Sequence, residues 1–179
     1  MIDGLKHAGL PEHSIQLLKN QDRSLVAEMI KKEKEIDLII PRGGKNLIKV
    51  IANDSNVPVL KHYDGLCHVY LDEDADSKKA KEIALNAKTY RFGICGAMET
   101  LLISETLDSS LIQEIINLFE QNQVEIRGCK VTSKKFNTLE AKEDDWKSEY
   151  LAPIIAIKIV KDVNEAIEHI NFYGSGHTD

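Results

Sequence analysis

The residues of this chain with the greatest capacity for covalent chemistry are its three cysteines, Cys67, Cys95 and Cys129. Cys95 differs from the others because Gly93 and Gly96 flank it, in the stretch YRFGICGAMETLLI. Glycines remove side-chain bulk and permit backbone angles that other residues avoid, so a ligand can approach the sulfur and the neighbouring N–H groups. A thiol at such a place is a nucleophile when its surroundings favour the thiolate. The alternative is a small, buried apolar side chain, because free cysteines are among the most buried residues.

A second pattern with chemical potential is the turn PRGGKN at residues 41–46. It follows an apolar run and precedes a helix-like run with Leu47, Ile48, Val50 and Ile51. The N–H groups at a helix start lie at the positive end of the helix dipole, and Arg42 adds a formal charge, so Gly43 and Gly44 can bind a phosphate group. The pattern is neither G-x-G-x-x-G nor a P-loop, so a plain turn without a ligand is the alternative.

The elements that must position these residues alternate between strand-like and helix-like periodicity, which predicts an α/β fold. The continuous apolar run at residues 37–40 is typical of a strand that is covered on both faces in a parallel sheet. Residues 130–148 are polar and are expected to be irregular. We predict strands at 14–18, 37–40, 57–62, 66–71, 99–104, 124–127 and 152–160, and helices at 3–9, 23–32, 47–51, 78–88, after Asp108 and after Asp162.

Helix starts are marked by acidic residues. Asp76 and Asp108 are expected to cap the helices that follow them. The stretch DVNE at residues 162–165 has the spacing of a capping box. In the helix after it, a buried stripe is expected, consisting of Val163, Ala166, Ile167 and Ile170.

Composition excludes several classes of function. The net charge of −6 disfavours a nucleic-acid partner, since phosphate binding needs a basic face. No apolar run has the length to cross a bilayer and no signal-peptide pattern follows Met1, so a cytoplasmic protein is expected. The odd number of cysteines, without a C-x-x-C pair, disfavours a disulfide framework and a zinc site. His62 and His68 have no partners at a convincing metal-ligand interval, so no metal is expected.

Three stretches, RFGICGAMETLL, VPVLKHYDGLCHVYLDEDAD and VNEAIEHINFYGSGHTD, resemble gamma-glutamyl phosphate reductase, also called glutamate-5-semialdehyde dehydrogenase. That family is a branch of the aldehyde dehydrogenase superfamily that acts in proline biosynthesis. The resemblance extends from Leu5 to Asp179 and covers only the middle portion of a family chain. Phe92 replaces a proline, and Gly96 an asparagine, that are usual in the family.

The resemblance implies an aldehyde dehydrogenase-like α/β fold with two parts. Residues 1–65 would form a partial dinucleotide-binding domain, in which Arg42, Gly43 and Gly44 face NADPH. Residues 66–179 would form the catalytic domain, truncated at its C-terminus, with Cys95 as the catalytic residue. The family usually has small residues where Lys45 and Asn46 stand, so weak cofactor binding is expected.

The implied reaction is the reduction of gamma-glutamyl phosphate. The substrate would acylate the Cys95 thiolate and expel phosphate, and hydride from NADPH would release glutamate-5-semialdehyde. The alternative is a catalytically impaired remnant, or an interaction module that keeps the fold without the chemistry. A homo-oligomer, most simply a dimer, is expected because apolar surface beside residues 37–40 would otherwise stay open.

Overall fold

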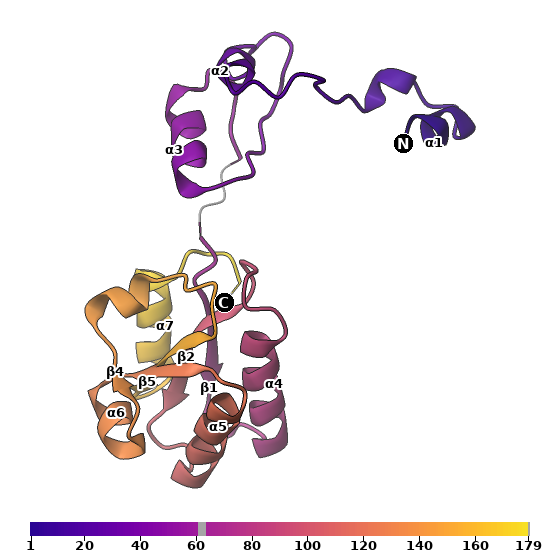
Figure 1. The fold of residues 1–179 in the computed structure, drawn as a ribbon. Helices are drawn as coiled ribbons and strands as arrows, with labels where there is room; N and C mark the ends of the chain where they lie inside the picture. The colour runs from indigo at the N-terminus through magenta and orange to yellow at the C-terminus, as the bar shows by residue number, and fades with distance from the viewer. Residues whose placement is uncertain (61–63, 179) are drawn as a thin grey trace. The chain divides into compact units, whose positions relative to one another are not determined.

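The computed structural model describes residues 1–60 and 64–178, and the chain divides into two units, Met1–Tyr63 and Asp64–Asp179 (Figure 1). Among the described residues, no helix is both long and apolar enough to cross a membrane.

The first unit is built around two helices, α2 (Ser24–Met29) and α3 (Lys45–Asp54). Ile48 and Ile51 of α3 are buried, as is Ile30 at the end of α2. The carbonyl oxygen of Ile30 accepts hydrogen bonds from Asn56 N at 2.9 Å and from Ser55 Oγ at 3.1 Å. These bonds tie the end of α2 to the turn after α3. The unit begins with α1 (Ile2–His7) and a 3-10 helix, η1 (Glu12–Ser14).

The strands predicted for this unit are largely wrong. Residues 14–18 are irregular after η1 and contain no strand. Of the run at 37–40 only Ile39 pairs, through one parallel bridge to Val59, which is also the only described pairing of the predicted strand at 57–62. Residues 61 and 62 of that strand lie outside the described residues. Leu38 and Ile40 are 50% and 56% exposed. The run is apolar, but no second strand among residues 1–60 covers it.

The second unit is a five-stranded, wholly parallel sheet with the strand order β1-β2-β5-β3-β4. The strands are β1 (Cys67–Leu71), β2 (Met98–Ser104), β3 (Glu125–Gly128), β4 (Leu139–Glu140) and β5 (Ile154–Val160). The central strand β2 is buried along its whole length. Such continuous burial is typical of parallel sheets that are covered on both faces, and it agrees with the apolar run LLI at residues 101–103.

Helices cover both faces of this sheet (Figure 1). The larger cluster of buried side chains lies between one face and the helices α4 (Ser77–Thr89) and α5 (Ser109–Gln121), and includes Leu101, Ile103 and Phe119. The opposite face packs against α7 (Val163–Tyr173). The predicted caps are confirmed: Asp76 accepts from Lys79 N at 2.9 Å, and Asp108 from Ser110 N at 2.8 Å.

Two predictions for the second unit are wrong. Residues 130–148 are ordered elements: α6 (Lys130–Phe136), β4 and the 3-10 helix η2 (Glu143–Lys147), in which Trp146 is buried. On α7, Ala166 is buried as expected, but Val163 and Ile167 are exposed. The other buried residue of this helix is His169. A polar residue on the buried side of the helix shifts the buried stripe away from the purely apolar positions.

Candidate functional site

Cys95 lies on the loop of residues 91–97, which connects the end of α4 to the start of β2. Because all strands are parallel, a residue just before β2 lies at the amino-end edge of the sheet. The Cys95 side chain is exposed, so the interpretation of this residue as a buried apolar side chain is wrong. The neighbouring Ala97 is buried and donates its N–H to Ile94 O at 3.0 Å, which closes a turn around the cysteine.

The backbone of Cys95 rests directly on Gly65. A Cβ atom at position 65 would lie 1.7 Å from the carbonyl oxygen of Cys95 and 2.7 Å from its Cα. No side chain fits there, so the close approach of these two segments requires glycine. The N–H of Gly65 donates to Glu149 Oε1 at 2.9 Å, which holds the segment from a third part of the chain.

Cys67, the first residue of β1, contacts the same carbonyl group. Its buried thiol donates to Cys95 O at 3.1 Å and lies 3.9 Å from Nδ1 of His177. Next to it, Leu66 N donates to Ser175 Oγ at 3.0 Å. The segments around Gly65, Cys95 and His177 therefore meet at one edge of the sheet, although they are far apart in the sequence.

A buried ion pair lies close behind the loop. Lys88, near the end of α4, donates to Glu99 Oε2 at 2.5 Å, and Glu99 Oε1 accepts from Leu151 N at 3.2 Å. Burial raises the pKa of Glu99 and lowers the pKa of Lys88, while the hydrogen bond and the charge attraction between them oppose both shifts. The pair connects the two elements that flank Cys95.

Cys129 is the competing thiol. It follows β3 and therefore lies at the carboxyl-end edge of the sheet, opposite the edge that carries Cys95. Burial by itself would raise the pKa of the Cys129 thiol. Hydrogen bonds from the Thr132 hydroxyl and from the backbone N–H groups of Thr132, Ile159 and Val131 outweigh it and lower this pKa. Cys129 is half-buried, whereas Cys95 is exposed. Solvent access therefore favours Cys95 as a nucleophile, while the lowered thiol pKa favours Cys129.

Two histidines meet between the sheet and α7: His68 belongs to β1 and His169 to α7. The rings of His68 and His169 are 5.6 Å apart between centroids, and Trp146 and Tyr173 contact His169 at 5.5 and 4.5 Å. Lys158 Nζ lies 3.4 Å from His169 Nδ1. Within residues 1–60 and 64–178, no group of three or more histidine, cysteine or acidic side chains is arranged to hold a metal ion.

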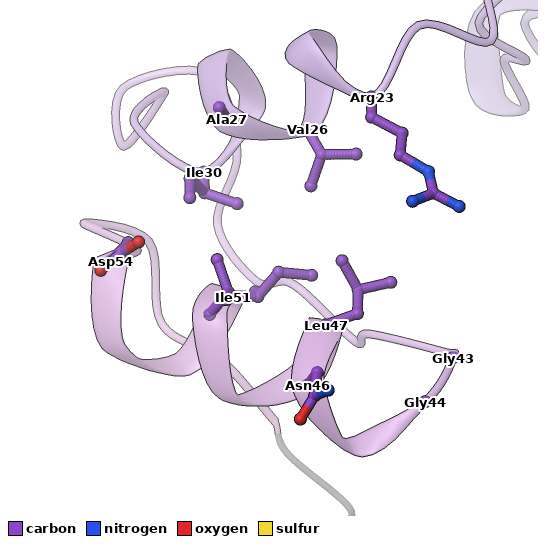
Figure 2. A pocket seen from close by; sticks show the side chains of 11 residues that line it. Arg23, Val26, Ala27, Ile30, Gly43, Gly44, Asn46, Leu47, Ile51 and Asp54 are labelled. Carbon is purple, nitrogen blue, oxygen red and sulfur yellow. The ribbon is translucent and has the colours of Figure 1, made fainter.

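The turn with Gly43 and Gly44 borders a cleft between α2 and α3 in the first unit (Figure 2). The cleft has a volume of ≈ 880 Å³ and mostly apolar walls. Gly43 has a φ of +148°, and a Cβ there would lie 2.9 Å from Leu47 Cδ2, so the turn requires glycine at this position. Arg42 is exposed and does not line the cleft, whereas Arg23 does. The lining residues are Arg23, Val26, Ala27, Ile30, Gly43, Gly44, Asn46, Leu47, Val50, Ile51 and Asp54.

The sequence pattern indicated the Cys95 loop and the turn at Gly43 and Gly44, but it did not indicate several residues that surround them in the structure. Lys88 follows Ala80 and Ala84 at intervals of four, so helical spacing alone puts it on the buried face of α4. A lysine on the buried face of a helix needs a partner of opposite charge, so this spacing could have indicated a buried carboxylate close to Lys88. Cys67 and Arg23 carry no comparable local signal.

Comparison with known proteins supports the fold. No family model matches the sequence. The chain is similar to gamma-glutamyl phosphate reductase from Thermotoga maritima, with 45% identity and a TM-score of 0.89 over 98% of this chain and 43% of that chain. An acetylating aldehyde dehydrogenase from Geobacillus thermoglucosidasius has 21% identity and a TM-score of 0.67 over 97% of this chain and 46% of that chain. NADP-dependent glyceraldehyde-3-phosphate dehydrogenase from Bacillus halodurans, solved with NADP, has 21% identity and a TM-score of 0.67 over 96% and 44%.

The parallel sheet with helices on both faces and a thiol on the loop before β2 therefore has the fold of the aldehyde dehydrogenase superfamily. Within that class, the chain resembles gamma-glutamyl phosphate reductase, as the three sequence stretches predict. It spans less than half the length of the Thermotoga reductase.

Proposed function

We propose that the second unit is the thiol-bearing part of a gamma-glutamyl phosphate reductase, with Cys95 as the catalytic residue. The observation that carries this proposal is the exposure of the Cys95 thiol. The backbone of the same residue is held in place because it packs directly against Gly65. In domain terms, residues 66–179 form the catalytic domain, and residues 1–65 form part of a dinucleotide-binding domain.

The chemistry of the thiol follows from the nature of an acyl phosphate. The Cys95 thiolate attacks the γ-carbonyl carbon, a C–S bond forms, the C–O bond to phosphate breaks, and inorganic phosphate leaves with its electron pair. The product is a thioester on Cys95. The glycines at 93 and 96 leave space beside the sulfur for the substrate.

The cleft of the first unit suits a nicotinamide dinucleotide. Its apolar walls fit a flat heterocyclic base, and the open turn at Gly43 and Gly44 exposes the N-terminus of α3 to a phosphate. Arg23 supplies a cation at the rim, and Arg42 adds a second on the turn. When bound, NADPH supplies the hydride that reduces a thioester to an aldehyde. The residues that line this cleft would hold and orient it.

The proposal is tested by acyl transfer to the purified chain. Incubation with acetyl phosphate, a simple acyl phosphate, followed by intact-mass and peptide analysis, is expected to show an acyl group on Cys95 that hydroxylamine removes. Cys95→Ala is expected to abolish the adduct, and Cys129→Ala to leave it. An unmodified Cys95, or an acyl group on Cys129 instead, would favour a folded chain without the chemistry.

Cofactor binding is tested separately by titrating NADPH and following its fluorescence. We infer that this cleft would hold only part of a dinucleotide, so a dissociation constant above the micromolar range is expected. Arg23→Ala should weaken it further, while Lys134→Ala, which removes an exposed cation on α6 of the second unit, should not. Micromolar affinity would contradict the expected weakness, and equal effects of the two substitutions would contradict the assignment to this cleft.

A further inference from the structure

Cys67 occupies an irregular point in the pairing of β1 with β2. Cys67 pairs with Met98, but the next residue of β1, His68, pairs with Thr100, so one residue of β2, Glu99, is skipped. A bulge of this kind redirects the strand that contains the extra residue, and bulges are frequent beside active sites. The start of β2 is the point to which the Cys95 loop is attached. The irregular register lies at Cys67, the first residue of β1, which contacts the backbone of that loop.

We propose that Cys67 is a positioning residue for the Cys95 thiol, acting through the Cys95 carbonyl group. The Cys67 thiol donates to this carbonyl oxygen at 3.1 Å, and Gly65 packs against the same peptide group. The carbonyl thus points inward, and the side chain of Cys95 is exposed on the outer side. The inference rests on the proposed role of Cys95 as the nucleophile.

The direction of a carbonyl group matters to a thiolate on the same residue. A carbonyl oxygen carries partial negative charge, and a nearby negative charge disfavours ionisation of a thiol. With its oxygen bound to Cys67, the carbonyl is kept from turning toward the Cys95 sulfur. Without the donor at position 67, the oxygen is free to reorient, and formation of the thiolate becomes less favourable.

The loop itself carries Arg91, and among the described residues other charged and titratable groups around it come from four further segments. They are His177, beside Cys67; Glu149, bound to Gly65 N; and the pair of Lys88 and Glu99, which flanks the loop. Of these groups only His177 contacts the Cys67 sulfur, at 3.9 Å, so a substitution at position 67 changes that contact as well. Measuring the pH profile of Cys95 also in a His177→Ala background separates the carbonyl contact from the His177 contact.

The test compares Cys67→Ser, which keeps a donor, with Cys67→Ala, which removes it. The rate of alkylation of Cys95 by limiting iodoacetamide is measured by peptide mass spectrometry between pH 6 and pH 10. Cys67→Ala is expected to slow the reaction at pH 7 by about fivefold, the factor that corresponds to one hydrogen bond of ordinary strength, and to move the pH midpoint upward. Cys67→Ser is expected to stay within about twofold of the unaltered chain, because a hydroxyl donates to the same oxygen.

The outcomes separate positioning from general loosening of the fold. An unchanged rate and midpoint in Cys67→Ala would overturn the proposal, and so would equal slowing in both variants, since the serine keeps the hydrogen bond. Urea unfolding of each variant shows whether the fold is retained, and Cys67→Val, which also lacks a donor but fills more of the buried space, provides the test if the alanine variant does not fold. Failure of acetyl phosphate to acylate Cys95 in the unaltered chain would reject the proposed function without affecting this comparison.

Discussion

The ammonium nitrogen of Lys88 lies 2.5 Å from Oε2 of Glu99, and the exposed fractions of the two side chains are 0% and 1%. Removing either partner leaves the other charge buried without compensation, which typically costs about 3–5 kcal/mol of unfolding free energy. We therefore expect Lys88→Met and Glu99→Gln each to destabilise the chain by about that amount. Together they should cost far less than the sum, because no lone charge then remains.

Urea unfolding of the two single variants and the double variant measures this coupling. The control is the pair of Lys78 and Glu82 on the same helix, which is exposed and separated by 4.0 Å. Lys78→Met and Glu82→Gln should each change stability by less than about 0.5 kcal/mol. Strict additivity at Lys88 and Glu99 would show that the two residues contribute independently.

The second prediction concerns His169. Burial, followed by the charges of Lys158 and His68, lowers the pKa of His169 to about 4, while Glu165 and Glu143 oppose the shift. A histidine with a lowered pKa in the folded state binds its proton more readily when the chain is unfolded. Below pH 6.5 the unfolded chain therefore gains stability relative to the folded one, until the folded state is also protonated near pH 4. The loss of stability across this window is about 3 kcal/mol.

Replacing His169 by phenylalanine should remove that part of the pH dependence. We expect the unfolding free energy of His169→Phe to change less between pH 7 and pH 5 than that of the unaltered chain. His13→Gln, at an exposed position, should leave the dependence as it was. Chemical unfolding at pH 7, 6 and 5 gives the comparison. Parallel pH curves for His169→Phe and the unaltered chain would contradict the assignment of this window to His169.

Outside residues 130–148, where α6, β4 and η2 were not predicted, local signals predicted the helices and strands of the second unit. Asp76 and Asp108 cap helices through contacts two or three residues away, and such contacts are readable from the sequence. The run at residues 37–40 shows the opposite case. Its apolar composition correctly indicates extended backbone at Ile39, but burial depends on neighbouring strands, which local sequence does not report.

The site was predictable only in part, because local patterns indicate exposure but not contacts between distant segments. Glycines on both sides of Cys95 indicate an accessible thiol, and the structure confirms the exposure. The contact from Cys67 spans 28 positions and depends on the irregular register between β1 and β2, so no spacing rule contains it. The rule that ligands bind at the carboxyl ends of parallel strands would point to the edge with Cys129 rather than the edge with Cys95.

The last prediction concerns association of the chain with itself. Leu38 and Ile40 are exposed on either side of the single bridge at Ile39, and among residues 1–60 no further strand pairs with this segment. Unpaired extended segments with apolar side chains tend to pair with a second chain. We expect a two-fold dimer in which this segment is covered. Ile48 and Ile51 of α3 are buried inside the unit and are not available for this contact.

Light scattering over a dilution series measures the mass. We expect Ile40→Lys to shift the mass toward the monomer without unfolding the chain, because a charge at the contact must lose its hydration when the segment is covered. Leu17→Lys is the matched control: Leu17 is 91% exposed and lies outside the segment, so its replacement should leave association unchanged. A monomeric mass for the unaltered chain at high concentration would remove the basis for the dimer. Equal dissociation by both substitutions would place the contact elsewhere, on a surface that includes the N-terminal part of the chain.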